Sequence, residues 1–218
     1  MFYIEQDNKI VLFDEDRQKL QNTLLFMPQY ASLEIKKVQE GYVILDFELM
    51  TIEEKEAEQA QKEAERIAML NLTAADVERA IYKAKGLDFN DVISLVEKQK
   101  ASIDIKALQI ELKANNFYRG NPYIDAVGTI LGFTKEQLDK FFDTNDYRYL
   151  TTCKLKVNAI PEDAVIEINS EIQSEITVPY GSTVDIVVSC EGYISRKDVL
   201  TLTEDRTLEV VLDEDTAE

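Results

Sequence analysis

Apolar and polar residues alternate with a period of two along the last third of the chain, from Cys153 to Leu212. This period is typical of strands that bury one face and expose the other. Turn signals containing proline or glycine separate the alternating runs. We therefore predict that residues 150–218 form a small all-β sandwich that ends in an acidic tail. The runs are Cys153–Ala159, Ile166–Ile168, Val184–Cys190 and Leu208–Leu212.

The first fifty residues combine short β-prone runs with one helical segment. A polar turn between the first two runs predicts a β-hairpin. A helix capped by Asp14 and stopped by Pro28 follows, and a second strand pair is expected around Gly41. Residues 1–50 are therefore predicted to form a small α/β unit, with a four-stranded sheet covered by one helix. The predicted strands are Phe2–Ile4, Ile10–Phe13, Leu33–Ile35 and Tyr42–Phe47.

Residues 51–72 have the composition of an exposed helix, because Glu, Gln, Ala and Lys dominate. Four small or apolar residues recur at a 3-4-3 spacing, which matches a short heptad seam. Two interpretations stay open: a solvated connector helix packed on a neighbour, or a parallel stalk that joins several copies. The residues of this seam are Ala57, Ala60, Ala64 and Ile67.

Residues 73–149 hold the densest helix start and stop signals, which predict a bundle of about five short helices. Thr73 can cap the first of them. Asn121, followed directly by proline, starts a later helix that Gly132 is placed to end. Thr134 then forms a capping box with Gln137. The remaining predicted starts are Asp88 or Asn90, and Ser102.

These patterns together predict a modular α+β protein. Its segments are a small N-terminal α/β unit, an acidic connector helix, a bundle of short helices and a C-terminal sandwich. The boundaries are 1–50, 51–72, 73–149 and 150–218.

The chain of 218 residues carries a net charge of −18. An acidic surface repels the phosphates of nucleic acids and anionic lipid headgroups, and no basic patch offsets it. We expect no binding to nucleic acid or to membranes. No apolar run approaches the roughly 20 residues that cross a bilayer, and no signal peptide is recognisable, so we expect synthesis in the cytoplasm.

The residue types on which most enzymes and metal sites depend are scarce. Histidine is absent, and Cys153 and Cys190 are the only cysteines. Both lie on the apolar phase of their runs, which favours core side chains over a redox pair. Carboxylates are plentiful, but no neighbouring base or glycine-rich phosphate loop singles one out. We expect no enzyme, no cofactor and no metal.

Two helices that meet near Gly132 have the outline of a DNA-binding helix-turn-helix. The second helix carries Glu136 and Asp139, however, which makes a poor surface for phosphate contact. The tyrosines are better candidates, since tyrosine is favoured at interfaces and in sugar contacts. The three candidates for contact with a partner are Tyr147, Tyr149 and Tyr180.

Five stretches form a distinctive series: Lys9–Asp14, Leu24–Gln29, Leu72–Val77, Tyr118–Asp125 and Leu131–Phe142. This series resembles small accessory proteins encoded among the structural genes of tailed bacteriophages and prophages of gut bacteria. The resemblance covers about two thirds of the chain, and it implies a setting in the virion more than a specific role.

The last third contains Val157–Ile168, the turn Val178–Gly181 and the triplet Glu191–Tyr193. This pattern is similar to PEGA-type or immunoglobulin-like (Ig-like) modules of surface and virion proteins. It departs from them in the second hairpin, where Asn169–Glu171 replaces the usual glycine. The resemblance implies an Ig-like sandwich displayed at the end of the molecule.

The resemblances imply a non-enzymatic structural protein of a phage virion, assembled in the cytoplasm of the bacterial host. A head fibre or capsid decoration protein is the first expectation. The alternatives are a tail or baseplate accessory protein, and an assembly chaperone that is absent from the mature particle. Expected partners are other virion proteins, further copies of the chain in a homotrimer joined by the alanine seam, and a glycan of the host surface.

Overall fold

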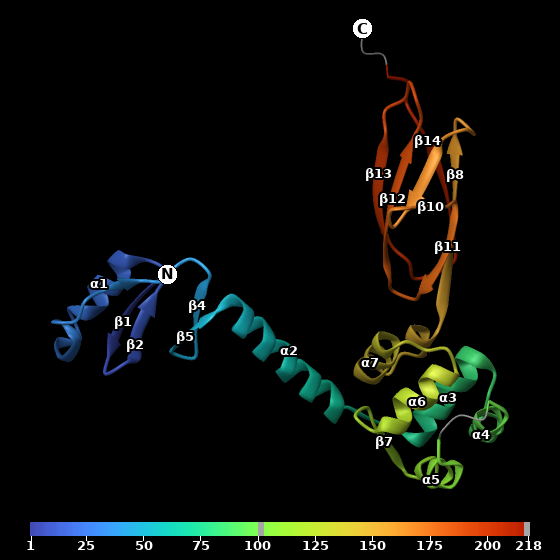
Figure 1. Ribbon diagram of the computed structural model, residues 1–218, viewed down its shortest axis with the longest axis horizontal. Coiled ribbons are helices and arrows are strands. Elements are labelled where there is room, and N and C mark those ends of the chain that lie inside the picture. The colour runs from blue at the N-terminus through green and yellow to red at the C-terminus, as the bar shows by residue number, and fades with distance from the viewer. Residues whose placement is uncertain (100–102, 216–218) are drawn as a thin grey trace. The chain divides into compact units, whose positions relative to one another are not determined.

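The computed structural model describes residues 1–99 and 103–215 of the chain (Figure 1). The predicted helix start at Ser102 and the last residue of the acidic tail, Glu218, lie outside the described residues. Two compact units are present, Met1–Arg66 and Ile67–Glu218, called here the N-terminal and the C-terminal unit. Over the described ranges the fold is mixed α and β, with seven α-helices and mostly antiparallel sheets, as the sequence predicts.

The N-terminal unit begins with the predicted hairpin. Strands β1 (Phe2–Gln6) and β2 (Lys9–Asp14) pair antiparallel, and β3 (Lys36–Lys37) pairs with the other edge of β1. Helix α1 (Arg17–Leu24) packs against β1 and β2. The helix is capped by Asp16, not by Asp14, because the side chain of Asp16 accepts the amide hydrogen of Gln18 at 2.8 Å. A short 3-10 helix, Pro28–Tyr30, follows.

The predicted second strand pair and the four-stranded sheet are wrong. Strand β4 (Tyr42–Leu45) pairs with β5 (Glu48–Thr51) in a separate two-stranded hairpin. The chain reverses at Asp46 and Phe47, whose φ angles are 48° and 65°. An aromatic residue is a poor signal for such a turn, so the apolar run predicts one strand ending at Phe47.

Helix α2 (Ile52–Met69) confirms the predicted connector helix. It starts in a capping box, since Thr51 and Glu54 exchange hydrogen bonds between side chain and backbone. None of its residues is buried. Ion pairs along one helix face support it, such as Lys62–Glu58 at 2.6 Å.

The helical part of the C-terminal unit follows the predicted starts closely. Thr73 and Asn121 cap their helices, and Thr134 and Gln137 form the predicted capping box. Asp88, one of the two alternatives, caps α4. The helices are α3 (Ala74–Lys85), α4 (Phe89–Lys98), α5 (Ile105–Glu111), α6 (Pro122–Ile130), α7 (Lys135–Thr144) and the 3-10 helix Tyr147–Leu150.

A two-stranded pairing that the sequence did not predict joins the start of this helical part to the segment between α5 and α6. Strand β6 (Asn71–Thr73) pairs antiparallel with β7 (Asn116–Tyr118). The backbone of Gly120 donates to the carbonyl of Ala68 at 3.0 Å. A Cβ atom at Gly120 would lie 3.0 Å from that carbonyl oxygen, so the absence of a side chain permits the close approach of the two backbones.

The last third of the chain contains two sheets that share one hydrophobic core. The sheet orders are β10-β9-β12-β13 and β11-β8-β14, with β14 parallel to β8 and the other pairs antiparallel. Buried residues of both sheets, including Leu155, Ile168 and Ile186, form the core. The strands are β8 (Thr152–Ile160), β9 (Val165–Ile168), β10 (Glu171–Ile172), β11 (Glu175–Pro179), β12 (Thr183–Ser189), β13 (Arg196–Thr201) and β14 (Arg206–Val211).

The hairpin in which the usual glycine is missing turns at Asn169 and Ser170, with φ angles of 52° and 67°. Both residues therefore adopt the left-handed conformation that glycine would accept without strain. Cys153 is buried in the core and Cys190 packs partly against it, both as free thiols, in agreement with the apolar phase of their strands.

Candidate functional site

The alanine seam of α2 lies on the surface. Ala57, Ala60 and Ala64 are exposed, and Ile67 is half-buried. Within the described residues the three alanines are exposed, so the face that they form is accessible to a further molecule. Whether copies of the chain join there stays a prediction.

The three candidate tyrosines are half-buried, and each contacts a neighbour in its own chain. Lys83 Nζ lies 4.8 Å from the centre of the Tyr147 ring. Tyr149 and Tyr180 meet edge to face, with ring centres 5.3 Å apart. The Arg148 guanidinium lies 5.1 Å from the centre of the Tyr180 ring. These contacts fix the rings in place and leave only part of each ring for a partner.

Arg148 also pairs with Asp146 at the start of the 3-10 helix. Its Nη2 lies 2.6 Å from Asp146 Oδ2, and its Nε donates to the same oxygen at 2.8 Å. These hydrogen bonds stabilise the charged carboxylate and lower the pKa of Asp146 below its ordinary value. A carboxylate held charged in this way is a structural anchor, not a proton donor near neutral pH.

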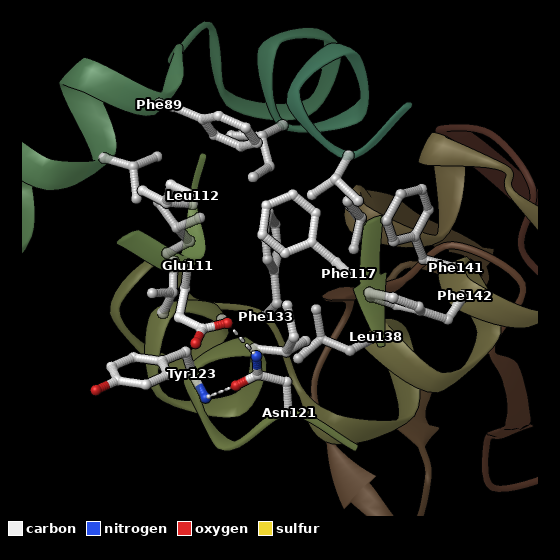
Figure 2. A pocket seen from close by; sticks show the side chains of 18 of the residues that line it. Phe89, Glu111, Leu112, Phe117, Asn121, Tyr123, Phe133, Leu138, Phe141 and Phe142 are labelled. Carbon is white, nitrogen blue, oxygen red and sulfur yellow. Dashed lines mark hydrogen bonds between the residues drawn. The ribbon is translucent and has the colours of Figure 1, made fainter. Parts of the chain in front are cut away.

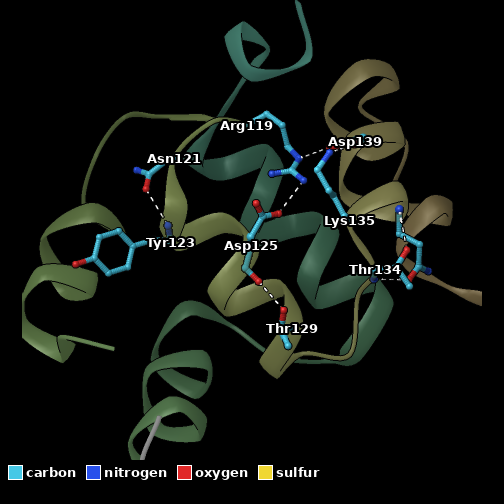
Figure 3. A network of polar contacts seen from close by, with 9 residues as sticks. Arg119, Asn121, Tyr123, Asp125, Thr129, Thr134, Lys135 and Asp139 are labelled. Carbon is cyan, nitrogen blue, oxygen red and sulfur yellow. Dashed lines mark hydrogen bonds and ion pairs between the residues drawn. The ribbon is translucent and has the colours of Figure 1, made fainter. Parts of the chain in front are cut away.

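The most buried charge of the helical part is Arg119, which sequence reasoning did not single out (Figure 3). Its side chain is 3% exposed, and Nε donates to Asp139 Oδ1 at 2.7 Å. Nη2 lies 2.8 Å from Asp125 Oδ1, although its N–H bonds do not point at that oxygen. Lys135 Nζ holds the second oxygen of Asp139 at 2.8 Å.

This arginine network joins β7 to α6 and α7, because Arg119 directly follows β7 while its two carboxylate partners lie on the helices. Both carboxylates face cations at ion-pair distance. Removing Asp139 would leave the buried Arg119 with only the more exposed Asp125, so we assign the network to the stability of the helical part.

The N-terminal unit exposes large apolar side chains. Leu25 and Phe26, just after α1, are 77% and 85% exposed. Phe13 and Phe47 are exposed as well, and their rings meet edge to face with centres 5.2 Å apart. Exposed aromatic clusters on a small unit mark surfaces that bind other proteins.

Phe47 is strained in addition to being exposed. Its φ of 65° lies in the left-handed region, which disfavours bulky side chains. Over the described ranges, the other residues with positive φ are Asp, Asn, Ser or Gly. A strained, exposed aromatic residue at a turn is a pattern associated with function, because neither the backbone nor the core requires it.

Two open grooves of the N-terminal unit share the buried Tyr3 and the exposed Leu49 in their linings. One has a volume of about 520 Å³ and is lined by residues of β3 and β4, including Lys36 and Tyr42. The other, of about 640 Å³, includes Phe47 in its lining. Its wall is mixed in charge, since Lys9 lies among three carboxylates. The exposed Phe47 ring is therefore bordered by polar groups, as at the rim of many protein interfaces.

The thiols do not form a reactive site. Burial raises the pKa of Cys153. Desolvation, together with Asp163 at 3.7 Å from Sγ, raises the pKa of Cys190. Both thiols are therefore protonated near neutral pH and are poor nucleophiles.

In the parts of the chain that the structure describes, no group of three or more Cys, Asp or Glu side chains is arranged to hold a metal ion. None of the helices in these parts is both long enough and apolar enough to span a membrane. In comparisons with known proteins, no family model matches this chain, and no curated protein matches it either.

Proposed function

We propose that the protein is a non-enzymatic structural component of a phage virion, a head fibre or a capsid decoration protein. The series of stretches that resembles phage accessory proteins supports this proposal. The division into two compact units also supports it, because a protein that attaches at one end and displays a domain at the other needs such a division.

In this proposal the last third of the chain is the displayed domain, an Ig-like sandwich of the PEGA type. Two observations support the assignment. Seven strands form sheets of four and three strands around a single core. The turn at Asn169 and Ser170 keeps the tight hairpin geometry without the usual glycine.

The proposal depends most on one observation, the strained conformation of the exposed Phe47. A residue in the left-handed conformation loses about 1–2 kcal/mol relative to an ordinary conformation. The Phe47 ring does not recover this through burial, because it is 53% exposed. We assign the ring to the surface by which the N-terminal unit docks on another virion protein, where burial against the partner would offset the strain.

The test compares Phe47→Gly with Ser170→Gly in phage whose genome encodes the chain. Both substitutions relieve a left-handed residue in a two-residue turn, but only the first removes an aromatic ring. Relief of about 1–2 kcal/mol in Phe47→Gly offsets the lost contact with Phe13, worth about 0.5–1.5 kcal/mol, so stability changes little.

Mass spectrometry of purified particles provides the readout. We expect the unaltered chain and Ser170→Gly to remain with the particles, and Phe47→Gly to be lost from them. If the Phe47→Gly chain remains with the particles, Phe47 is not part of the docking surface. Absence of the unaltered chain from mature particles would instead favour the second candidate, an assembly chaperone.

Electron microscopy of labelled particles distinguishes a head position from a tail or baseplate position.

The exposed alanine face of α2 supports a second part of the proposal, a homotrimer. Ala57, Ala60 and Ala64 are small enough for helices to approach closely. Light scattering on the full chain tests it with Ala60→Glu, which places a charge in the seam. Gln59→Glu adds the same charge outside the seam and serves as the control. We expect a trimer that only Ala60→Glu dissociates, and a monomeric unaltered chain would contradict this part.

We propose weak contact with a host-surface glycan at Tyr147 and Tyr149 of the 3-10 helix and at Tyr180 of the displayed domain. Multivalent display would supply the avidity that a single shallow site lacks. A glycan array probed with the oligomer tests it, with Tyr180→Ala as the variant and Tyr193→Ala as the control. Equal signals from the two variants would exclude Tyr180 from the contact.

A further inference from the structure

The core of the helical part encloses an apolar cavity of about 50 Å³ (Figure 2). It is lined by side chains from the five helices α3 to α7, from β7 and from the 3-10 helix, among them Val92, Leu108, Phe117, Val127 and Phe141. Each of these five residues is buried. The cavity therefore belongs to the packed core and is not a depression of the surface.

The walls of the cavity are held apart by rigid contacts. Phe89 and Phe117 meet edge to face with ring centres 5.8 Å apart on one side. On another side α6 and α7 are already at their closest approach, because a Cβ atom at Gly128 would lie 2.6 Å from Leu138 Cδ1. Close packing at this contact opposes an inward movement of α6 toward α7.

The polar groups of the wall bond to one another. Asn121 Nδ2 donates to Glu111 Oε2 at 2.7 Å, and Asn121 Oδ1 accepts from the backbone of Tyr123 at 3.0 Å. Figure 2 shows these three residues together at one side of the cavity, apart from the rings of Phe141 and Phe142. A buried water needs two to four polar partners, which this lining does not supply, so the cavity is dry.

Tyr123 separates the cavity from the outside. The same side chain lines the cavity and a cleft of about 280 Å³, whose other walls include Ile103, Asp104 and Pro122. Tyr123 is half-buried and is shared by the linings of the cleft and the cavity. Entry of a ligand past this side chain would not require the helices to separate.

We propose that this cavity is a binding site for a small apolar ligand, the size of a noble-gas atom or a one- or two-carbon alkyl group. Dispersion contacts with the surrounding side chains provide the affinity, since the wall of the cavity is almost entirely apolar. The size limit follows from an engineered cavity of about 150 Å³ that binds benzene or xenon. The present cavity has about one third of that volume, so it excludes benzene.

The test uses xenon and benzene as probes of the full-length chain, followed by methyl NMR. We expect xenon to cause saturable shifts at Val92, Leu108 and Val127, and not at Leu155 in the core of the two sheets. Benzene should cause none. Absent shifts, or xenon shifts of equal size at Leu155, would overturn the proposal.

Two variants sharpen this result. Val127→Ile fills part of the space and should abolish the xenon shifts, whereas Val157→Ile adds the same methylene to the core of the two sheets and should leave them unchanged. Leu108→Ala enlarges the cavity and should admit benzene. If Leu108→Ala does not fold, Val127→Ile decides alone, and xenon shifts that persist in it place the ligand elsewhere.

Discussion

The N-terminal and C-terminal units bury their apolar residues to very different degrees. In Met1–Arg66 the buried apolar side chains are Tyr3, Ile4, Ile10, Leu20 and Ile44. Among the described residues of the C-terminal unit, fourteen such side chains form one core and ten form another. Large exposed apolar residues, in contrast, are frequent in the N-terminal unit and include Phe26 and Phe47.

This difference indicates a division of labour. A unit with a small core has a small free energy of unfolding. We therefore do not expect it to expose aromatic rings, or to hold one in a strained turn, unless contact with another molecule offsets the cost. The C-terminal unit is stabilised by its own interior. The N-terminal unit instead exposes large apolar side chains, which is why we propose the docking surface there.

The largest expected effect is in the dense core. Phe141→Ala removes a ring that is 1% exposed and should lower the free energy of unfolding by about 3–5 kcal/mol. Guanidinium unfolding followed by NMR signals of each unit provides the measurement. Only the C-terminal unit should lose stability, and Phe13→Ala should have a much smaller effect. Simultaneous loss of the N-terminal signals would show that the two units do not fold independently.

A smaller effect is expected where α6 meets α7. Gly128→Ala places a methyl group against Leu138 and should cost about 1–3 kcal/mol of stability by overpacking. Thr129→Ala, at the next, exposed position of the same helix, is the control. Alanine favours a helix at both positions, so helix propensity alone would raise stability in both variants. A stabilised Gly128→Ala would mean that the two helices can separate easily.

In the N-terminal unit, replacing an exposed aromatic residue should have little effect on stability. Phe26→Ser alters a side chain that is 85% exposed, so stability should change by less than about 0.5 kcal/mol. Leu20→Ala, at a position only 2% exposed, should cost about 2–5 kcal/mol. Thermal unfolding at several protein concentrations checks both. Destabilisation by Phe26→Ser that grows with concentration would show that copies of the chain bury Phe26 between them.

The smallest effect concerns pH and the C-terminal unit. Because Arg148 lowers the pKa of Asp146, the folded state favours the charged carboxylate. The stabilisation is complete above the ordinary pKa of about 3.8, and it is lost as the pH falls through the lower folded value. Asp146→Asn should therefore flatten the decline of stability below about pH 4. An unchanged decline would mean that other carboxylates account for it.

The features that the sequence predicted correctly are those with local causes. Three helix caps are examples, because the side-chain oxygen of each cap accepts a hydrogen bond from a backbone N–H two or three residues later. These caps are Thr73, Asn121 and Thr134. The alternation from Cys153 onward likewise identified β8 and β12. Each of these signals lies within a few residues of the structure that it determines.

The features that the sequence did not predict depend on residues far apart in the chain. The pairing of β6 with β7 joins Leu72 to Phe117. The Arg119 network depends on the burial of a single charged residue. Phe47 lies in a turn and has a positive φ, which phenylalanine rarely adopts, so its residue type did not predict the turn. The fold class and most helix caps were predicted from the sequence, but the exposed and strained conformation of Phe47 was not.

The close approach of Gly120 to Ala68 has a mechanical consequence. Pulling force that travels along α2 reaches the C-terminal unit at Ala68 and Leu70, which accept backbone hydrogen bonds from Gly120 and Arg119 at 3.0 and 2.8 Å. The β6–β7 pair lies immediately beyond. Under tension, these few backbone hydrogen bonds would therefore break first. The apolar core would experience the force only after they had broken.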